Sequence, residues 1–144
     1  MSELTFRKVE KKDLKVVFPL LQQLTEIDYS NRDIDECWRH FSENTSVNGI
    51  VGIFNDEIVA YGCIVIENKI RGDVSGQIED IVVDQKHRKL NIGYHLIKEL
   101  VKIGRNKSCY RITLFCDEKL IPFYSKNGFE VNNIVMKKFF KDEL

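Results

Sequence analysis

The sequence predicts an α+β fold in which helices flank a mixed, mostly antiparallel sheet on both sides. Two observations support this class. The 144 residues are the size of one domain, which we expect to span residues 1–144. Strand and helix patterns follow one another in the order β-α-α-β-β-β-α-β-α-β-β, without repeats and without a linker. The hydrophobic content of 43% is ordinary for a globular protein.

The first half of the chain is predicted to hold two helices and three strands. Leu4 and Phe6 alternate with polar residues in a short first strand. Apolar residues at helical spacing indicate a helix over residues 13–24, which Pro19 kinks or delays. The run Ser30-Asn31-Arg32-Asp33 resembles a capping box that opens a second helix through Trp38 and Phe41. Asn48-Gly49 marks a turn, and residues 50–54 and 58–66 form strands joined by a hairpin over residues 55–57.

The second half begins with a polar loop over residues 67–75, followed by a strand over residues 76–84. Residues 92–104 form the clearest helix, because one face carries Ile92, Leu96, Leu100 and Ile103. A strand over residues 110–116 leads to a short helix over residues 120–126, with Pro122 in its first turn. Asn127-Gly128 ends that helix in a left-handed cap. Residues 129–131 and 134–140 are predicted to be the last strands.

Charge and targeting patterns exclude several classes of function. Lys+Arg and Asp+Glu both number 22, so no global field favours nucleic acid or an anionic membrane. No segment approaches the roughly 18 apolar residues of a membrane span, and the N-terminus lacks the apolar core of a signal peptide. The last four residues, Lys141 to Leu144, spell an ER-retention tetrapeptide that is read only in the lumen. We therefore expect a cytoplasmic protein in which this tail is not used.

The cysteines are predicted to be reduced thiols. Cys37, Cys63, Cys109 and Cys116 form no C-x-x-C pair and have no nearby histidine at metal-binding spacing. We therefore expect neither a disulfide nor a metal site.

The stretch from Gly76 to Gly93, GQIEDIVVDQKHRKLNIG, carries the strongest functional signal. Two adjacent acids, Glu79 and Asp80, interrupt an apolar strand. A basic loop then precedes a helix that begins near Ile92, and the start of a helix attracts phosphate through its unpaired N–H groups and partial positive charge. The pattern predicts a phosphorylated cofactor that is delivered to a general base. A solvated loop beside an edge acid pair is the alternative.

Two motifs resemble those of the GCN5-related N-acetyltransferase (GNAT) family. Residues 88–93, RKLNIG, resemble its pyrophosphate loop, and residues 121–129, IPFYSKNGF, resemble its late helix-turn. The pieces LQQLTE, IENK, GQIEDIVV, CYRITL and FYSKNGF occur in the right order and resemble the members that acetylate glucosamine 6-phosphate. Asn91 replaces the first glycine of the loop, and Phe115 and Leu120 replace an acid and an asparagine of those relatives.

The resemblance implies the GNAT fold and acetyl transfer from acetyl-CoA, the acetyl-donor co-substrate, to the 2-amino group of D-glucosamine 6-phosphate. The product, N-acetyl-D-glucosamine 6-phosphate, lies on the route to UDP-N-acetylglucosamine. It also implies a homodimer whose subunits share each sugar site, and no metal.

The resemblance also assigns roles to residues. Glu79 and Asp80 would bind the sugar and take or relay the ammonium proton, and Tyr124 would donate a hydrogen bond to the developing thiolate. Because neighbours on a strand point to opposite faces, the two acids cannot act identically unless a bulge intervenes. Backbone groups that would bind the cofactor belong to Ile81, Val82, Val83, Arg88, Lys89, Leu90, Asn91, Ile92, Gly93 and Tyr94. Residues that would bind the sugar phosphate are Thr25, Glu67, Asn68, Lys69, Ile70, Glu79, Asp80, Tyr110 and Arg111, and Lys69 and Arg111 supply the cations.

Two other functions stay open at this point. The chain could acetylate another small amine or a protein N-terminus, in which case Lys69 and Arg111 would have no phosphate to bind. It could also be a CoA-binding regulatory module without catalysis, an idea that Phe115 and Leu120 favour and that the retained Glu79, Asp80 and Tyr124 oppose.

Overall fold

The computed structural model describes residues 3–25 and 28–140, and it has the predicted α+β class. The chain forms two compact units, Met1–Leu114 and Phe115–Leu144. The first unit contains β1 Leu4–Lys8, α1 Leu14–Gln22, α2 Ile34–Glu43, β2 Val47–Phe54, β3 Glu57–Asn68, β4 Val74–Val83, α3 Ile92–Asn106 and β5 Arg111–Leu114. Short 3-10 turns occupy Lys11–Asp13 and Gln85–Leu90.

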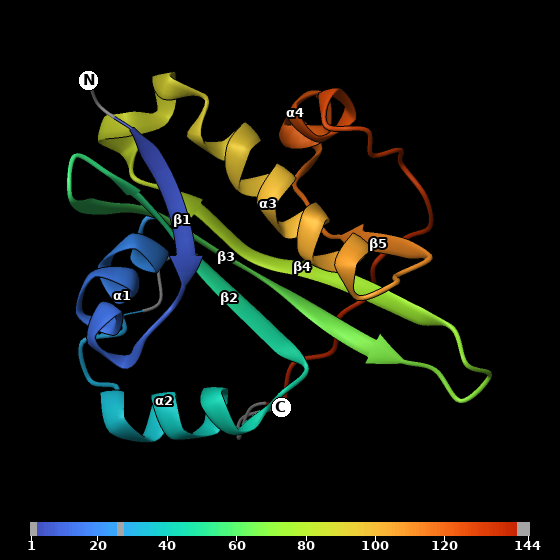
Figure 1. Cartoon of the computed structure of the whole chain (residues 1–144), viewed down its shortest axis with the longest axis horizontal. Helices are drawn as coiled ribbons and strands as arrows, with labels where there is room; N and C mark the ends of the chain where they lie inside the picture. Colours follow the sequence, from blue (N-terminus) through green and yellow to red (C-terminus); the bar gives the residue numbers. More distant parts are fainter. Residues whose placement is uncertain (1–2, 26–27, 141–144) are drawn as a thin grey trace. The chain divides into compact units, whose positions relative to one another are not determined.

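The five strands form one mixed sheet in the order β1-β2-β3-β4-β5 (Figure 1). The first four strands are antiparallel neighbours, and β5 pairs parallel to β4. The predicted hairpin between β2 and β3 is confirmed, because Asn55 and Asp56 have φ values of 53° and 64°, the left-handed backbone of a tight two-residue turn. Helix α3 lies between β4 and β5 in the chain, as a parallel connection requires.

One face of the sheet packs against α3. The predicted face of this helix is confirmed, since Ile103 is partly buried and Ile92, Leu96 and Leu100 are fully buried. Each such side chain stabilises the fold by about 1.5–3 kcal/mol. Gly62 on β3 lies under the helix. An added Cβ there would stand 3.1 Å from Cδ1 of Leu100 on α3 and 2.6 Å from Cδ1 of Ile81 on β4.

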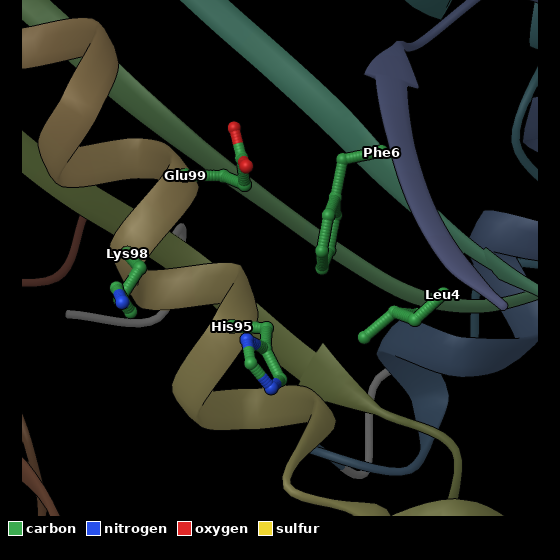
Figure 2. A pocket seen from close by; sticks show the side chains of 5 residues that line it. All are labelled: Leu4, Phe6, His95, Lys98 and Glu99. Carbon is green, nitrogen blue, oxygen red and sulfur yellow. The ribbon is translucent and has the colours of Figure 1, made fainter.

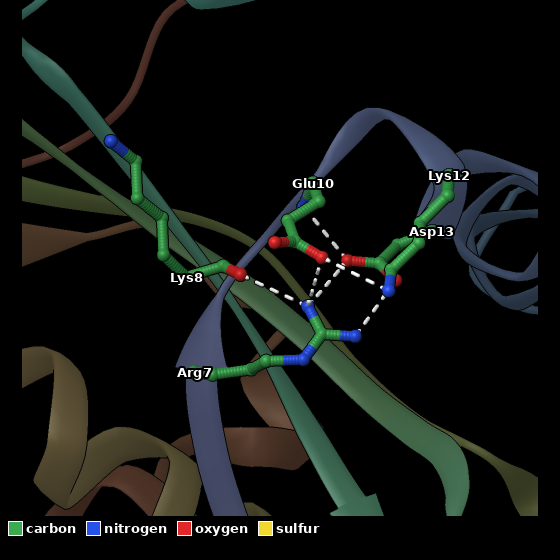
Figure 3. Close-up of polar contacts among 5 residues, drawn as sticks. All are labelled: Arg7, Lys8, Glu10, Lys12 and Asp13. Carbon is green, nitrogen blue, oxygen red and sulfur yellow. Dashed lines mark hydrogen bonds and ion pairs between the residues drawn. The ribbon is translucent and has the colours of Figure 1, made fainter.

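The opposite face packs against α1 and α2. Its buried cluster contains Val9, Val17, Leu20, Val51, Tyr61, Cys63 and Val82, with Trp38 and Phe41 of α2 packed against it. Pro19 lies inside α1, as predicted. A partly buried ion pair joins β1 to the start of α1: the guanidinium of Arg7 donates to both oxygens of the buried Asp13 at 2.7 and 2.9 Å (Figure 3). The hydrogen bonds from Arg7 hold the pKa of Asp13 below its usual value.

Two predictions for the first unit are wrong. Helix α2 is capped by Asp33, whose side chain accepts from the backbone of Glu36, so Ser30 does not open a capping box. Asn48-Gly49 is not a turn but part of β2, and the chain turns earlier, where the Asn44 side chain accepts from the backbone of Ser46. Gly49 serves close packing instead, because an added Cβ would lie 2.9 Å from the ring of Phe41.

The second unit contains a 3-10 turn, Glu118–Leu120, and α4 Ile121–Lys126. Pro122 stands in the first turn of α4 and Gly128 follows it with φ 89°, both as predicted. The two predicted last strands are wrong for the described chain, which has no strand from residue 129 to 140. A strand needs a pairing partner, and the apolar side chains from Val131 onward are exposed, with Ile134 at 90% and Met136 at 92%. The ER-retention tetrapeptide lies outside the described residues.

No helix within the described ranges is both long enough and apolar enough to cross a membrane.

Candidate active site

A β-bulge in β4 brings the two predicted acids together. Tyr61 pairs with Val82 and Cys63 with Glu79, so Gly62 alone on β3 opposes Asp80 and Ile81 on β4. Asp80 has φ 57°, a left-handed conformation inside a strand. The extra residue cancels the usual alternation of faces. The bulge therefore allows Glu79 and Asp80, although they are neighbours on one strand, to act at the same place.

The acids share their site with a buried thiol. The sulfur of Cys63 and one carboxylate oxygen each from Glu79 and Asp80 all lie within 4.8 Å of one another. Among the described residues, this is the group whose geometry could hold a cation. Burial, together with the charges of Asp80 and Glu79, raises the pKa of Cys63 to about 12, so this thiol stays protonated. The four cysteines are free thiols, as predicted.

The side chains of Glu79 and Asp80 are exposed, and partial desolvation raises the pKa of Asp80 above its usual value. Within the described ranges neither Asp80 nor Glu79 has a lysine, arginine or histidine partner within ion-pair distance. A raised pKa makes a carboxylate a stronger base, and two unpaired acids favour a cationic ligand such as an ammonium group.

A groove of about 160 Å³ extends from Glu79 along the same face of the sheet, and Asp80 is not among the residues that line it. The residues that line it come from β3, β4 and β5 and are Val65, Glu67, Ser75, Gln77, Glu79, Arg111 and Thr113. Three of the predicted sugar-binding residues, Glu67, Glu79 and Arg111, therefore share one groove. Sequence reasoning missed the other four. A strand period of two, counted back from Glu79, would have found Gln77 and Ser75.

The two predicted phosphate cations differ in their surroundings. Lys69 donates to Glu67 at 2.6 Å and is already paired. Arg111 has no carboxylate within 4.0 Å among the described residues, and its guanidinium lies 5.3 Å from the centre of the Tyr110 ring. The positive charge of Arg111 is thus available to an anion in the groove.

The remaining predicted sugar residues are less informative. Asn68 is exposed at the end of β3, and Ile70 is fully exposed in the turn after it. The hydroxyl of Tyr110 accepts from Arg71 at 3.0 Å. Thr25 follows α1 and is partly buried.

The backbone of β4 opens where the cofactor is predicted to bind. Pairing between β4 and β5 covers Ser75 to Ile78 only, and Glu79–Val83 pair with β3 alone in the described register. Ile81 and Val82 therefore turn one edge of their backbone away from any paired strand. Arg88 Nε donates to the carbonyl of Val83 at 3.4 Å, which ties the loop to the end of the strand.

The residues of the predicted pyrophosphate loop form a short turn that leads into α3. Residues 85–90 form a 3-10 turn, and Asn91 has φ 58° before α3 begins at Ile92. Asparagine adopts this left-handed conformation more readily than most residues, so it can replace the family glycine here. Gly93 and Tyr94 then lie in the first turn of the helix, where N–H groups have no partner within the helix.

In the second unit, Tyr124 lies on α4 and is 8% exposed. Its ring makes edge contacts with Phe123 and Phe129, with ring centres 4.9 and 6.0 Å apart. Burial, and then the charge of Cys116, raises the pKa of Tyr124, so its phenol stays protonated. A protonated phenol can donate a hydrogen bond.

A second hollow, of about 290 Å³, lies between β1 and α3. Leu4 and Phe6 of β1 face His95, Lys98 and Glu99 of α3 across it (Figure 2). None of the predicted site residues lines this hollow.

The chain is similar to known acetyltransferases over most of its length. A family model described as the acetyltransferase (GNAT) family matches residues 15–129. Glucosamine 6-phosphate N-acetyltransferase 1 of Dictyostelium discoideum is 31% identical, covering 92% of this chain and 88% of the relative. The glucosamine 6-phosphate N-acetyltransferase of Trypanosoma brucei brucei is 33% identical, covering 94% and 95%.

A solved structure of glucosamine-6-phosphate N-acetyltransferase from Arabidopsis thaliana superposes with a TM-score of 0.86 at 29% identity, covering 96% of this chain and 99% of that one. The similarity in sequence and the similarity in fold thus extend over the same range. The chain belongs to the acetyltransferase (GNAT) family.

Proposed function

We propose that this protein transfers the acetyl group of acetyl-CoA to the 2-amino group of D-glucosamine 6-phosphate. The observation that carries this substrate is the charge pattern of the β3–β5 groove. Glu79 lines the groove with Asp80 close to it, and Arg111 contributes to the lining; among the described residues neither Glu79 nor Arg111 forms an ion pair. An amino-sugar phosphate carries an ammonium group and a phosphate, which match these two charges. The substrate named for the curated relatives supports the same choice.

The reaction needs the amine as a free base. We assign proton removal to Asp80, because its raised pKa makes it the better base, and sugar binding to Glu79. The free amine then attacks the thioester carbonyl and the C–N bond forms. The C–S bond breaks as the CoA thiolate leaves, and the nitrogen loses its second proton, which neutralises the thiolate. Tyr124 would donate a hydrogen bond to the negative charge that develops on the sulfur.

Acetyl-CoA is the donor that members of this family use. We assign its arm to the open backbone edge at Ile81 to Val83 and its pyrophosphate to the backbone of residues 88–94. The unpaired N–H groups at the start of α3 support the second assignment.

Acetyl-CoA is expected to stabilise the folded protein by mass action. At a concentration a hundredfold above the dissociation constant, the gain is about 2.7 kcal/mol, which a thermal melt detects. Acetyl-pantetheine lacks the pyrophosphate and should raise the melting temperature much less. Equal shifts from the two donors, or no shift from either, would contradict the assignment of the loop.

Arg111→Ala is expected to raise the Michaelis constant for glucosamine 6-phosphate about tenfold to a hundredfold, because a hydrogen bond between charged groups contributes roughly 1.5–3 kcal/mol. The constant for acetyl-CoA should not change. Steady-state assays of thiol release measure both values. The matched control is Lys69→Ala, which removes a cation that is already paired with Glu67 and should have a smaller effect. A mutant that still prefers the phosphorylated sugar over glucosamine as strongly as wild type would show that the phosphate is held elsewhere.

The proposal includes the organisation of the protein. We take residues 1–144 as one N-acetyltransferase domain, and the family match over residues 15–129, which extends into both compact units, supports this.

We also expect a homodimer with shared sugar sites. The exposed apolar side chains between residues 131 and 140 support it, because a second copy would remove them from water. The four free thiols fit a reducing cytoplasm, where the product would enter UDP-N-acetylglucosamine biosynthesis.

A further inference from the structure

Gln77 occupies the middle of the groove floor. It pairs with Val65 on β3 and with Thr113 on β5, and all three residues line the groove. Glu79 lies two residues further along β4 on the same face. Ser75 lies two residues before it and pairs with Arg111. Each step of two residues along a strand is about 7 Å, so Gln77 stands between the acids and the row that contains Arg111.

The amide of Gln77 is bonded to a proposed active-site acid. Its Nε2 donates to Oε1 of Glu79 at 3.0 Å. No described cation pairs with Glu79, so this exposed bond is the hydrogen bond that the described side chains give its carboxylate. A site residue is held in a productive position by such supporting contacts.

The amide has bonding capacity left over. A glutamine amide offers two N–H donors and a carbonyl acceptor, and the bond to Glu79 uses one donor. If the amine of the sugar lies at the acids and its phosphate at Arg111, the ring carbons between C2 and C6 cross the row of Gln77. The hydroxyls on those carbons are at C3 and C4, and either can bond to an amide.

We propose that Gln77 sets the specificity for the amino sugar, by holding Glu79 in position and by bonding a ring hydroxyl between the amine and the phosphate. This inference rests on the proposed function, because it takes the occupant of the groove to be an amino-sugar phosphate. It makes Gln77 a positioning residue toward Glu79 and a binding residue toward the sugar.

The test compares glucosamine 6-phosphate with its C4 epimer, galactosamine 6-phosphate, and with its C3 epimer, allosamine 6-phosphate, as competing substrates. Gln77→Met keeps the length of the side chain and removes the amide. It is expected to lower kcat/KM for glucosamine 6-phosphate about tenfold or more and to reduce the preference for it over one of the two epimers at least fivefold (about 1 kcal/mol). The Michaelis constant for acetyl-CoA should not change.

Gln77→Glu keeps the shape and replaces the donor by a charge that repels Glu79, so kcat/KM should fall further than in Gln77→Met. Gln22→Met is the matched control, because it removes another amide that donates to a carboxylate, that of Asp28 at 3.4 Å, outside the groove. It should keep the wild-type preference. A wild-type preference in both Gln77 variants overturns the proposal. Failure of wild type to acetylate glucosamine 6-phosphate would instead overturn the proposed function, so the two failures are distinguishable.

Discussion

Asp80→Asn is expected to lower turnover about a hundredfold to ten-thousandfold and, at the same time, to raise the melting temperature. The loss of turnover follows from the removal of the proposed general base, since a positioned base contributes about two to four orders of magnitude. The amide keeps the size of the side chain and its ability to bond, so the loss can be assigned to the proton acceptor.

The gain in stability follows from the pKa of Asp80. Desolvation raises this pKa in the folded protein, so the folded state binds the proton more tightly than the unfolded state does. Ionised Asp80 therefore lowers the free energy of unfolding above its folded-state pKa, and this penalty fades as the pH falls through that value. Asparagine cannot ionise, so the variant avoids the penalty at pH 7 and loses this advantage in acid.

A control separates charge from backbone strain. Asp56 also has a left-handed backbone, with φ 64° in the β2–β3 turn, where asparagine is well tolerated. Asp56→Asn should therefore show any gain that comes from the backbone alone, with wild-type turnover. Thermal melts at pH 7 and in acid, together with thiol-release assays, measure these effects. Wild-type turnover in Asp80→Asn would rule out Asp80 as the base.

The features that local patterns encode were predicted from the sequence. The buried face of α3 follows from helical spacing, and the hairpin at Asn55 and Asp56 follows from turn chemistry. The left-handed conformation of Asn91 fits the resemblance to the family loop, where Asn91 replaces a glycine. In each case the information lies within a few residues of the feature.

The positions of features that depend on residues far away in the sequence could not be predicted. The bulge at Asp80 is defined by its pairing opposite Gly62 on another strand. The alternation of faces along β4 shows that a bulge is needed for both acids to act together, but it does not show where the bulge lies. The pair Asn48-Gly49 has the local pattern of a turn. The reason for the glycine is its close contact with Phe41, which belongs to another element and cannot be found from neighbouring residues. The groove residues Ser75 and Thr113 depend on the register between β4 and β5. Residues 129–140 have an apolar strand pattern, but a strand also requires a partner, which the described chain does not supply.

Tyr124→Phe is expected to lower turnover about a hundredfold to a thousandfold, because one donor to the charge of a transition state is worth roughly 2.7–4 kcal/mol. The substitution removes only the hydroxyl. The ring stays buried between Phe123 and Phe129, so the fold of α4 should be retained. The binding of acetyl-CoA should change little, since the charge on sulfur develops only as the C–S bond breaks.

Because the pKa of Tyr124 is raised, the fall in turnover of Tyr124→Phe should be the same across the working pH range. Burial keeps the phenol protonated, so wild type has the donor at every pH at which the amine can be acetylated, and the ratio of wild-type to mutant turnover should not vary with pH. Tyr29→Phe is the matched control, because the Tyr29 ring contacts Phe18 and none of the proposed roles involves it. Single-turnover measurements of thiol release isolate the chemical step. If that step proceeds at the wild-type rate in Tyr124→Phe, then the thiolate leaves without help from Tyr124, and the tyrosine serves only to pack α4.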